Sequence, residues 1–337
     1  MFIIEHLLLA LGGITLFLTG LKFMSENMEE LAGEKMKTLL SSCTKNNVYG
    51  VMTGAISTAV IQSSIATNVI LVGFVSNGIM SFYQASSVIM GANIGTTITA
   101  QLVSLSGKDT FNVTALGSLI AFAGFIFSFI KKGKFQEIGG VMMGFGMLFL
   151  GLDIVSESVN YFKYFEKFRS IFTVKNHFVL LLNGLIITAI VQSSSAVTSV
   201  MIILASNGLI TFESSMFLIF GANIGTCLAV IVSAIGKSAP ARQTAFFNLA
   251  FNVFGSIILF VPVSLLSSEI TQVFSTFSST IERQIANFHT LFNLLITLIL
   301  LPILKPFTNF ISKIITDKRT ISKPKKLKGY TPLTKNV

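Results

Sequence analysis

A short polar motif occurs twice in this chain, each time inside a long apolar stretch. The first copy reads Gln62-Ser63-Ser64 and the second reads Gln192-Ser193-Ser194-Ser195. Each copy is followed by the sequence Gly-Ala-Asn-Ile-Gly-Thr, at residues 91–96 and 221–226. None of these side chains carries a formal charge, but hydroxyl and amide groups are costly in apolar surroundings unless they have hydrogen-bond partners. The fold or a ligand must therefore supply those partners.

The composition indicates a membrane protein. Of the 337 residues, 52% are hydrophobic and 11% are charged, whereas soluble domains contain about 25% charged residues. A net charge of +10 could suit a nucleic-acid-binding protein, but much of the excess follows Pro302. Basic residues concentrate on the cytoplasmic side of membranes. We therefore expect the lipid bilayer of the cell membrane as the partner, no nucleic acid, and a cytoplasmic C-terminus.

An internal duplication relates the two copies. Residues 54–99 align with residues 184–229 at an offset of 130, with 19 identities in 46 positions, and the alignment continues upstream at an offset of 131. Such self-similarity indicates a repeated structural unit. The expected organisation is a first repeat, a second repeat, a C-terminal membrane segment and a basic, disordered tail, at residues 1–137, 138–266, 267–306 and 307–337.

The first repeat is expected to cross the membrane three times. Residues 3–23 and 111–130 are apolar runs of spanning length, and the charges within 25–47 follow the spacing of an interfacial helix. The motif divides residues 48–76 into halves too short for a hydrocarbon core of ~30 Å, which predicts a re-entrant hairpin. Residues 84–105 could span, but their glycines and polar side chains predict a discontinuous helix.

The second repeat should contain the same elements in the opposite orientation, because an odd number of crossings inverts the repeat that follows. Its hairpin is expected at 177–206 and its discontinuous helix at 213–235. A last span is expected near 286–304, after a polar stretch at 267–285. The predicted fold class is an all-α polytopic membrane protein with two inverted-topology repeats, each with a re-entrant hairpin and a discontinuous helix, plus a C-terminal span.

Catalysis is a poor explanation for the motifs. Their serines have no neighbouring His or Lys to act as a base, and a lone histidine such as His289 is more often a helix-packing donor. Cys43 and Cys227 have no ligand neighbours, so neither a disulfide nor a bound metal cofactor is expected. We predict that the chain is not an enzyme.

Binding explains the motifs better. Helix N-termini at two hairpin tips would attract an anion, and serine hydroxyls would add neutral donors. Amide, hydroxyl and freed backbone oxygens suit a dehydrated Na⁺. Close helix packing also uses small residues, but it does not need a Gln beside two Ser at the same place in both repeats. The expected oxygen donors on the two discontinuous helices are Asn93, Thr96, Asn223 and Thr226.

The paired Gln-Ser-Ser motifs resemble those of the sodium/phosphate cotransporter family, the type II group with bacterial relatives. The Gly-Ala-Asn-Ile-Gly-Thr segments and the sequence Phe288-His289-Thr290-Leu291-Phe292-Asn293 resemble bacterial members, and the resemblance covers residues 5–305. It implies sodium-dependent symport of inorganic phosphate, with Na⁺ as the coupling ion and no cofactor. It also implies that phosphate and sodium are bound by the motif residues Gln62, Ser63, Ser64, Gln192, Ser193, Ser194 and Ser195.

The first copy departs from this pattern. Ile65 stands where the second copy has Ser195, so the first half offers one hydroxyl fewer. We therefore expect the second copy to make more of the ligand contacts.

Two other functions fit the same residues. A carrier of the same fold could take a different small anion, such as sulfate or a carboxylate, because neither motif contains an arginine. A non-transporting membrane protein, acting as a sensor or assembly partner, could instead use the basic tail.

Overall fold

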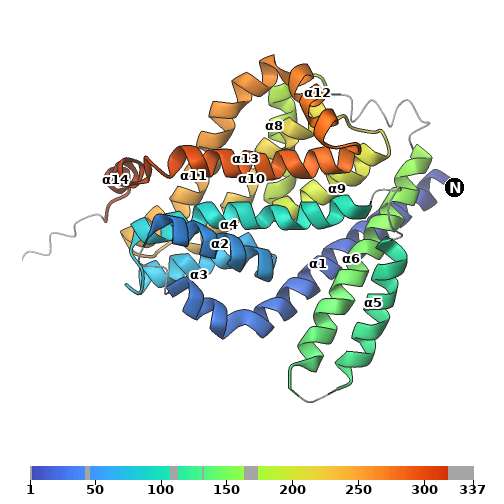
Figure 1. Ribbon diagram of the computed structural model, residues 1–337, viewed down its shortest axis with the longest axis horizontal. Coiled ribbons are helices and arrows are strands. Elements are labelled where there is room, and N and C mark those ends of the chain that lie inside the picture. Colours follow the sequence, from blue (N-terminus) through green and yellow to red (C-terminus); the bar gives the residue numbers. More distant parts are fainter. Residues whose placement is uncertain (1, 42–45, 107–112, 131–132, 163–173, 318–337) are drawn as a thin grey trace, which may run out of the picture.

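The computed structural model describes residues 2–41, 46–106, 113–130, 133–162 and 174–317. These residues form helices and no strand, which confirms the all-α expectation (Figure 1). The helices of the first half are α1 (Phe2–Ser41), α2 (Asn47–Ile61), α3 (Ser64–Ser76), α4 (Phe82–Val103), α5 (Val113–Ser128) and α6 (Phe135–Phe162). Those of the second half are α8 (His177–Val191), α9 (Ser194–Ser206), α10 (Phe212–Ser233), α11 (Ala239–Leu265), α12 (Ser267–Phe277), α13 (Ile281–Leu300) and α14 (Leu304–Ile314).

Within the described residues, four helices are long and apolar enough to cross a membrane: α1, α6, α10 and α11. The pair α13 and α14, bent by 86°, could form a fifth span. The span expected at 111–130 begins outside the described residues. Its described part, α5, has 16 residues, or ~24 Å of helix at 1.5 Å per residue, and does not reach spanning length by itself.

α1 is one continuous helix of 40 residues. The sequence predicted a span at 3–23 and a separate interfacial helix at 25–47, and this division is wrong. No Gly or Pro interrupts residues 21–32, so the helical spacing of the charged residues extends the same helix. In Figure 1, α1 runs from the N-terminus along α6 and on towards the α2–α3 pair.

Glycines bring α1 and α6 into close contact. A Cβ atom on Gly13 would clash with the backbone of Gly151, and one on Gly20 would clash with the backbone of Gly144. The contacts pair ascending positions on α1 with descending positions on α6, so the two helices are antiparallel. The long α1 of the first repeat is thereby fixed against α6, most of which lies in the second repeat.

α4 and α10 are continuous helices of 22 residues each, so the discontinuous helices predicted at 84–105 and 213–235 are wrong. Their glycines serve close packing instead, because an added Cβ would meet a backbone carbonyl oxygen of the neighbouring helix. In each of four such contacts, the glycine and its neighbour are 40 positions apart in the sequence. Because this separation stays constant along the helices, α4 runs parallel to α2 and α10 runs parallel to α8. The pairs are Gly91 with Val51, Gly95 with Ala55, Gly221 with Leu181, and Gly225 with Leu185.

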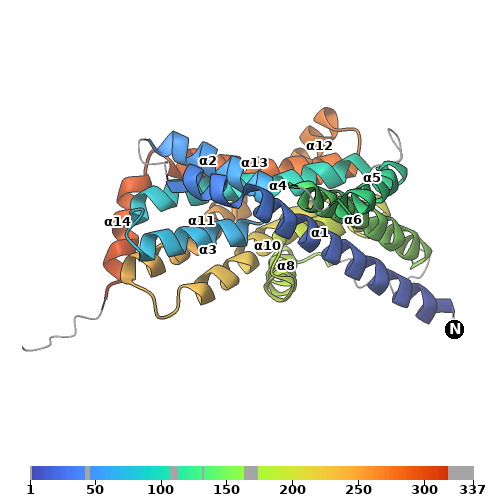
Figure 2. The same ribbon diagram turned by 90° about the horizontal axis from the view of Figure 1, so that it is seen from below.

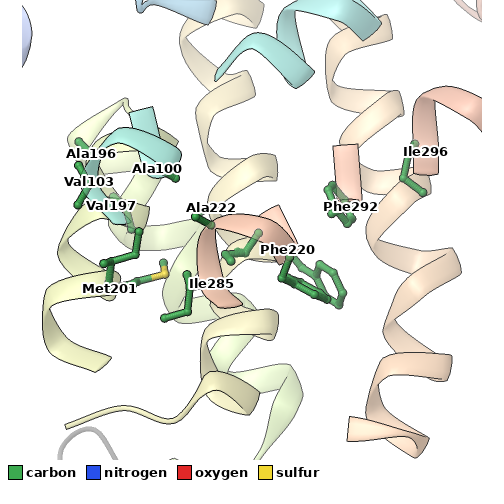
Figure 3. Close-up of a cluster of buried hydrophobic side chains, with 14 of the residues drawn as sticks. Ala100, Val103, Ala196, Val197, Met201, Phe220, Ala222, Ile285, Phe292 and Ile296 are labelled. Atoms are coloured by element: carbon green, nitrogen blue, oxygen red, sulfur yellow. The ribbon is translucent and has the colours of Figure 1, made fainter. Parts of the chain in front are cut away.

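The apolar core joins the two halves of the chain. Figure 3 shows side chains of α4 beside those of α9, α10 and α13, among them Ala100, Val197, Met201 and Ile285. Figure 2 shows three of these helices stacked through the thickness of the molecule, with α4 and α13 on one side of α10. Because α9 begins at the second motif, this core holds that motif against the first repeat.

The C-terminal region is more ordered than expected. α12 occupies part of the polar stretch at 267–285, and α14 extends into the segment expected to be a disordered tail, so that expectation is wrong up to residue 317. The side chains of Arg242 and Gln243 explain the order: Arg242 Nη2 donates to Thr316 O at 3.0 Å and Gln243 Nε2 donates to Ile315 O at 2.7 Å. Residues 318–337 lie outside the described residues.

Candidate functional site

Each Gln-Ser-Ser motif separates two helices. α2 ends at Ile61 and α3 begins at Ser64, while α8 ends at Val191 and α9 begins at Ser194. These helix pairs cover 47–76 and 177–206, close to the two expected hairpins. Thr58 Oγ1 donates to Thr67 Oγ1 at 3.1 Å and joins α2 to α3 just behind the first break. Their re-entrant position in a membrane and the inversion of the repeats remain predictions.

Gln62 and Gln192 stop the helices by adopting a left-handed backbone conformation, with φ of 59° and 58°. They are the only non-glycine residues with positive φ in the described part of the chain. Glycine is usual at this position of a helix end, and another residue costs roughly 1–2 kcal/mol there. A glutamine held twice in this conformation indicates that its side chain is needed.

Ser63 and Ser193 start the following helices. Ser63 Oγ accepts a hydrogen bond from Ala66 N at 3.1 Å, and Ser193 Oγ accepts one from Ala196 N at 3.2 Å. These caps satisfy one of the free amides in each first turn and leave others available. The N-termini of α3 and α9 therefore each present a partial positive charge.

Both motifs line one cavity of about 400 Å³. This volume is many times what one water molecule requires, so it can hold a small anion with accompanying ions. Most of the remaining wall belongs to α1, and Thr226 of α10 contributes as well. The motif residues on the wall are Gln62, Ser63, Ser64, Gln192, Ser193, Ser194 and Ser195.

The two glutamines differ in their partners. The Gln62 side chain is held at both ends, since Nε2 donates to Ala59 O and Oε1 accepts from Thr99 Oγ1 at 2.7 Å. Gln192 is exposed and lines the cavity, and its side-chain amide makes no hydrogen bond to a described residue. The second glutamine is therefore free to bind a ligand, whereas the first is fixed within its own repeat.

The second motif also carries an additional hydroxyl. Ser195 is 5% exposed, and its Oγ lies 3.1 Å from Ser193 Oγ. Ile65 occupies the equivalent place on the cavity wall. Of the two motifs, the second therefore brings one more hydroxyl group to the cavity wall.

Of the four oxygen donors predicted on α4 and α10, one lies on the cavity wall. Thr226 lies on the cavity wall, and its Oγ1 donates to Ala222 O at 3.1 Å within α10. Thr96 makes the equivalent bond to Ala92 O at 3.0 Å and does not line the cavity. Asn93 and Asn223 do not line it either.

Asn93 belongs to a buried polar cluster between α4 and α11. Asn93 Nδ2 donates to Asn248 Oδ1 at 3.1 Å, and Asn252 Nδ2 donates to Asn93 Oδ1 at 3.2 Å. Asn248 and Asn252 were not among the residues predicted from the sequence, although their spacing of one helical turn within an apolar run was an available signal.

Asn223 extends this cluster towards α13. Its Oδ1 lies 3.1 Å from Nε2 of His289, which is fully buried, so the lone histidine does make an interhelical polar contact. Several buried atoms nearby have no hydrogen-bond partner among the described residues: Asn223 Nδ2, Asn252 Oδ1, His289 Nδ1 and Asn293 Oδ1.

The contribution of α1 to the cavity was not predicted from the sequence either. The polar residues that α1 adds to the cavity wall are Lys22, Ser25, Glu26 and Glu29. A signal was present, because Ser25 and Glu26 recur in the second repeat at an offset of 131, as Ser156 and Glu157. Assigning them to an interfacial helix placed them away from the motifs.

A family model described as Na⁺/Pi-cotransporter matches residues 16–157 and 164–295. Among curated proteins, "Uncharacterized protein YqeW" of Bacillus subtilis is 26% identical over 90% of this chain and 97% of its own length. "Putative inorganic phosphate export protein YjbB" of Escherichia coli is 27% identical over 93% of this chain, which spans 56% of that protein.

A shorter match relates the chain to human proteins. "Sodium-dependent phosphate transport protein 2B" of Homo sapiens is 34% identical over 30% of this chain and 15% of its own length. No solved structure matches the chain significantly.

Proposed function

Because this chain belongs to the Na⁺/Pi-cotransporter family, whose members are membrane transporters and not enzymes, we propose that it carries inorganic phosphate across the cell membrane in symport with Na⁺. It is a multi-pass membrane protein, with several helices of spanning length. One observation carries the proposal: two motifs 130 residues apart line a single cavity.

Phosphate suits the chemistry of this cavity. An oxyanion needs several hydrogen-bond donors, and helix N-termini bind anions through free amides and the helix dipole. The N-termini of α3 and α9 lie at the motifs, where the serine hydroxyls and the unpaired amide of Gln192 add neutral donors. We propose that phosphate binds between these two helix ends.

Sodium suits the oxygen atoms of the same residues. Na⁺ is a hard cation that takes hydroxyl, amide and backbone carbonyl oxygens, which transporters provide where helices are interrupted. Gln192 Oε1, Ser195 Oγ and the carbonyl groups at the two breaks are of this kind. Binding of Na⁺ beside phosphate would also offset part of the anion's charge, which gives a physical reason for coupling.

Asn93 and Asn223 are proposed to contribute from the buried polar cluster and not from the cavity wall. Asn93 is linked to Asn252 of α11 and so connects the two repeats, while Asn223 is linked to His289 of α13 in the C-terminal segment. The C-terminus is proposed to be cytoplasmic, in keeping with its basic charge.

The direction of net transport follows from the ion gradients. One relative is named as a phosphate export protein and another as a sodium-dependent phosphate transport protein. A symporter works in either direction, so both names are compatible with one coupled mechanism.

Transport in cells tests the proposal. A host lacking its own phosphate transporters should move ³²P-phosphate faster in Na⁺ medium than in K⁺ medium when it expresses this protein. Gln192→Ala should lose at least about tenfold of that rate, since it removes a polar group in the cavity. Transport that is indifferent both to Na⁺ and to Gln192→Ala would contradict the proposal.

A second candidate is a carrier of another small anion, favoured by the absence of arginine from the cavity wall. Sulfate or a small carboxylate that competes with ³²P-phosphate more strongly than unlabelled phosphate would favour it. A sensor function would instead leave the motif variants active and make residues 318–337 essential.

A further inference from the structure

The charged residues on the wall of the motif cavity all come from α1. They are Lys22, Glu26 and Glu29, and every other lining residue is neutral. With Ser25 they follow a spacing of three and four residues, so they share one face of the helix. The two motifs supply only neutral hydrogen-bonding groups, and Lys22 is the one full positive charge that a described residue brings to the cavity.

α1 is anchored next to the first motif. Ser25 Oγ donates a hydrogen bond of 2.8 Å to Ile61 O, the last carbonyl group before Gln62. This contact holds the charged face of α1 at the tip of the α2–α3 pair. Lys22, one turn away from Ser25 on the same face, is thereby kept at the cavity.

Lys22 is only weakly held by its acidic neighbour. Lys22 Nζ lies 3.7 Å from Glu26 Oε1, and the two side chains are 75% and 60% exposed. Exposed ion pairs contribute ~0–1 kcal/mol, and at this spacing a Lys placed before a Glu is the less favourable order. The pair can therefore open at little cost when a stronger anion is present.

The second repeat has the opposite charge at this position. At the offset of 131, Asp153 corresponds to Lys22. Asp153 lines a separate cavity of about 420 Å³ that contains no motif residue. The motif cavity therefore has a lysine, Lys22, at a position where the second repeat has an acidic residue, Asp153.

Resting on the phosphate transport proposed above, we propose that Lys22 binds the transported phosphate and that Glu26 competes with phosphate for the Lys22 ammonium group. In the empty cavity Lys22 pairs with Glu26. When phosphate enters, the ammonium group turns to the anion, whose double negative charge attracts it more strongly than one exposed carboxylate does. Lys22 then favours a dianion over a monoanion such as a small monocarboxylate.

Transport kinetics of the full chain in proteoliposomes test this inference. Lys22→Gln should raise the KM for phosphate about tenfold with little change in kcat, since a charge-assisted contact to the substrate is lost, and Lys22→Arg should restore it. Glu26→Gln should lower the KM, because the competitor for Lys22 is removed. The opposite signs matter, since a purely structural ion pair would give both substitutions the same effect.

A matched control lies on the same helix. Lys37 Nζ and Glu34 Oε1 form an exposed ion pair of 3.3 Å away from the cavity, so Lys37→Gln should leave KM and kcat unchanged. An unchanged KM in Lys22→Gln, or a raised KM in both Lys22→Gln and Glu26→Gln, would overturn the inference while phosphate transport by the unaltered protein still stood. No Na⁺-dependent phosphate flux in the unaltered protein would overturn the proposed function itself.

Discussion

Gln62 and Gln192 share one backbone conformation and serve different purposes. Both hold the left-handed φ at a helix end, but only Gln62 has its amide bound within its own repeat. In each motif the glutamine is the C-cap of one helix and the following serine is the N-cap of the next. Glycine would adopt this φ at a lower conformational cost, so the presence of glutamine indicates that its side chain has a function.

Substitution of Gln192 by glycine should separate stability from transport. Glycine accepts the left-handed φ without a steric penalty, so Gln192→Gly should stabilise the protein by about 1 kcal/mol, since no described hydrogen bond of its side chain is lost. Phosphate flux should fall by about tenfold or more, as in Gln192→Ala. Thermal unfolding in detergent and flux in proteoliposomes measure the two effects; a variant that is both more stable and fully active would show that the side chain is dispensable.

The asymmetry between Ser195 and Ile65 gives a second prediction at this scale. Ser195 Oγ lies in the cavity beside Ser193 Oγ, so Ser195→Ala removes a hydroxyl from the site and should lower phosphate flux about tenfold. Ile65→Ala removes only apolar surface there and should reduce flux less. Comparison of initial rates at equal protein density checks this, and equal losses in the two variants would argue against a larger share for the second motif.

Among the helices, the sequence predicted the breaks within the hairpins and missed the continuity of α4 and α10. Gln-Ser-Ser in an apolar run is a local signal, because the stop and the cap involve residues within one turn. Glycine in a helix is ambiguous, since it can mark unwinding or a close approach of another helix. That neighbour, α2 or α8, is 40 residues away in sequence and could not be identified from the motif.

The charged part of α1 was misassigned for a related reason. Its amphipathic spacing fits an interfacial helix, and the sequence alone does not say that a cavity covers the polar face. The hydrogen bond from Ser25 to Ile61 O reveals the position of α1, and it joins residues 36 positions apart in the sequence. Only the tertiary contact shows that α1 forms part of the site.

Packing through glycine predicts two opposite outcomes for the same type of substitution. Gly91→Ala would push a methyl group into the Val51 carbonyl oxygen of α2, so it should destabilise the protein by ~1–3 kcal/mol. Gly73→Ala in α3 meets nothing within 4 Å and should stabilise it by ~0.5–1 kcal/mol. Thermal unfolding of both variants provides the comparison, and equal tolerance at both positions would contradict the observed α2–α4 packing.

Taken as a whole, the molecule combines two similar halves in different arrangements. Ser25 bonds to the end of α2 at the first motif, whereas the equivalent Ser156 accepts a 3.0 Å hydrogen bond from Asn207, at the far end of α9 from the second motif. The duplication was readable from the sequence, but this difference between the halves was not, because it depends on contacts and not on residue types.

The central claim is that the cavity between the two Gln-Ser-Ser motifs carries phosphate together with sodium. Purified protein in proteoliposomes, given ³²P-phosphate on the outside and an inward Na⁺ gradient, tests it most directly. We expect phosphate accumulation that an equal K⁺ gradient does not drive and that Gln192→Ala abolishes or greatly reduces. Equal accumulation under the two gradients, unchanged in Gln192→Ala, would contradict it.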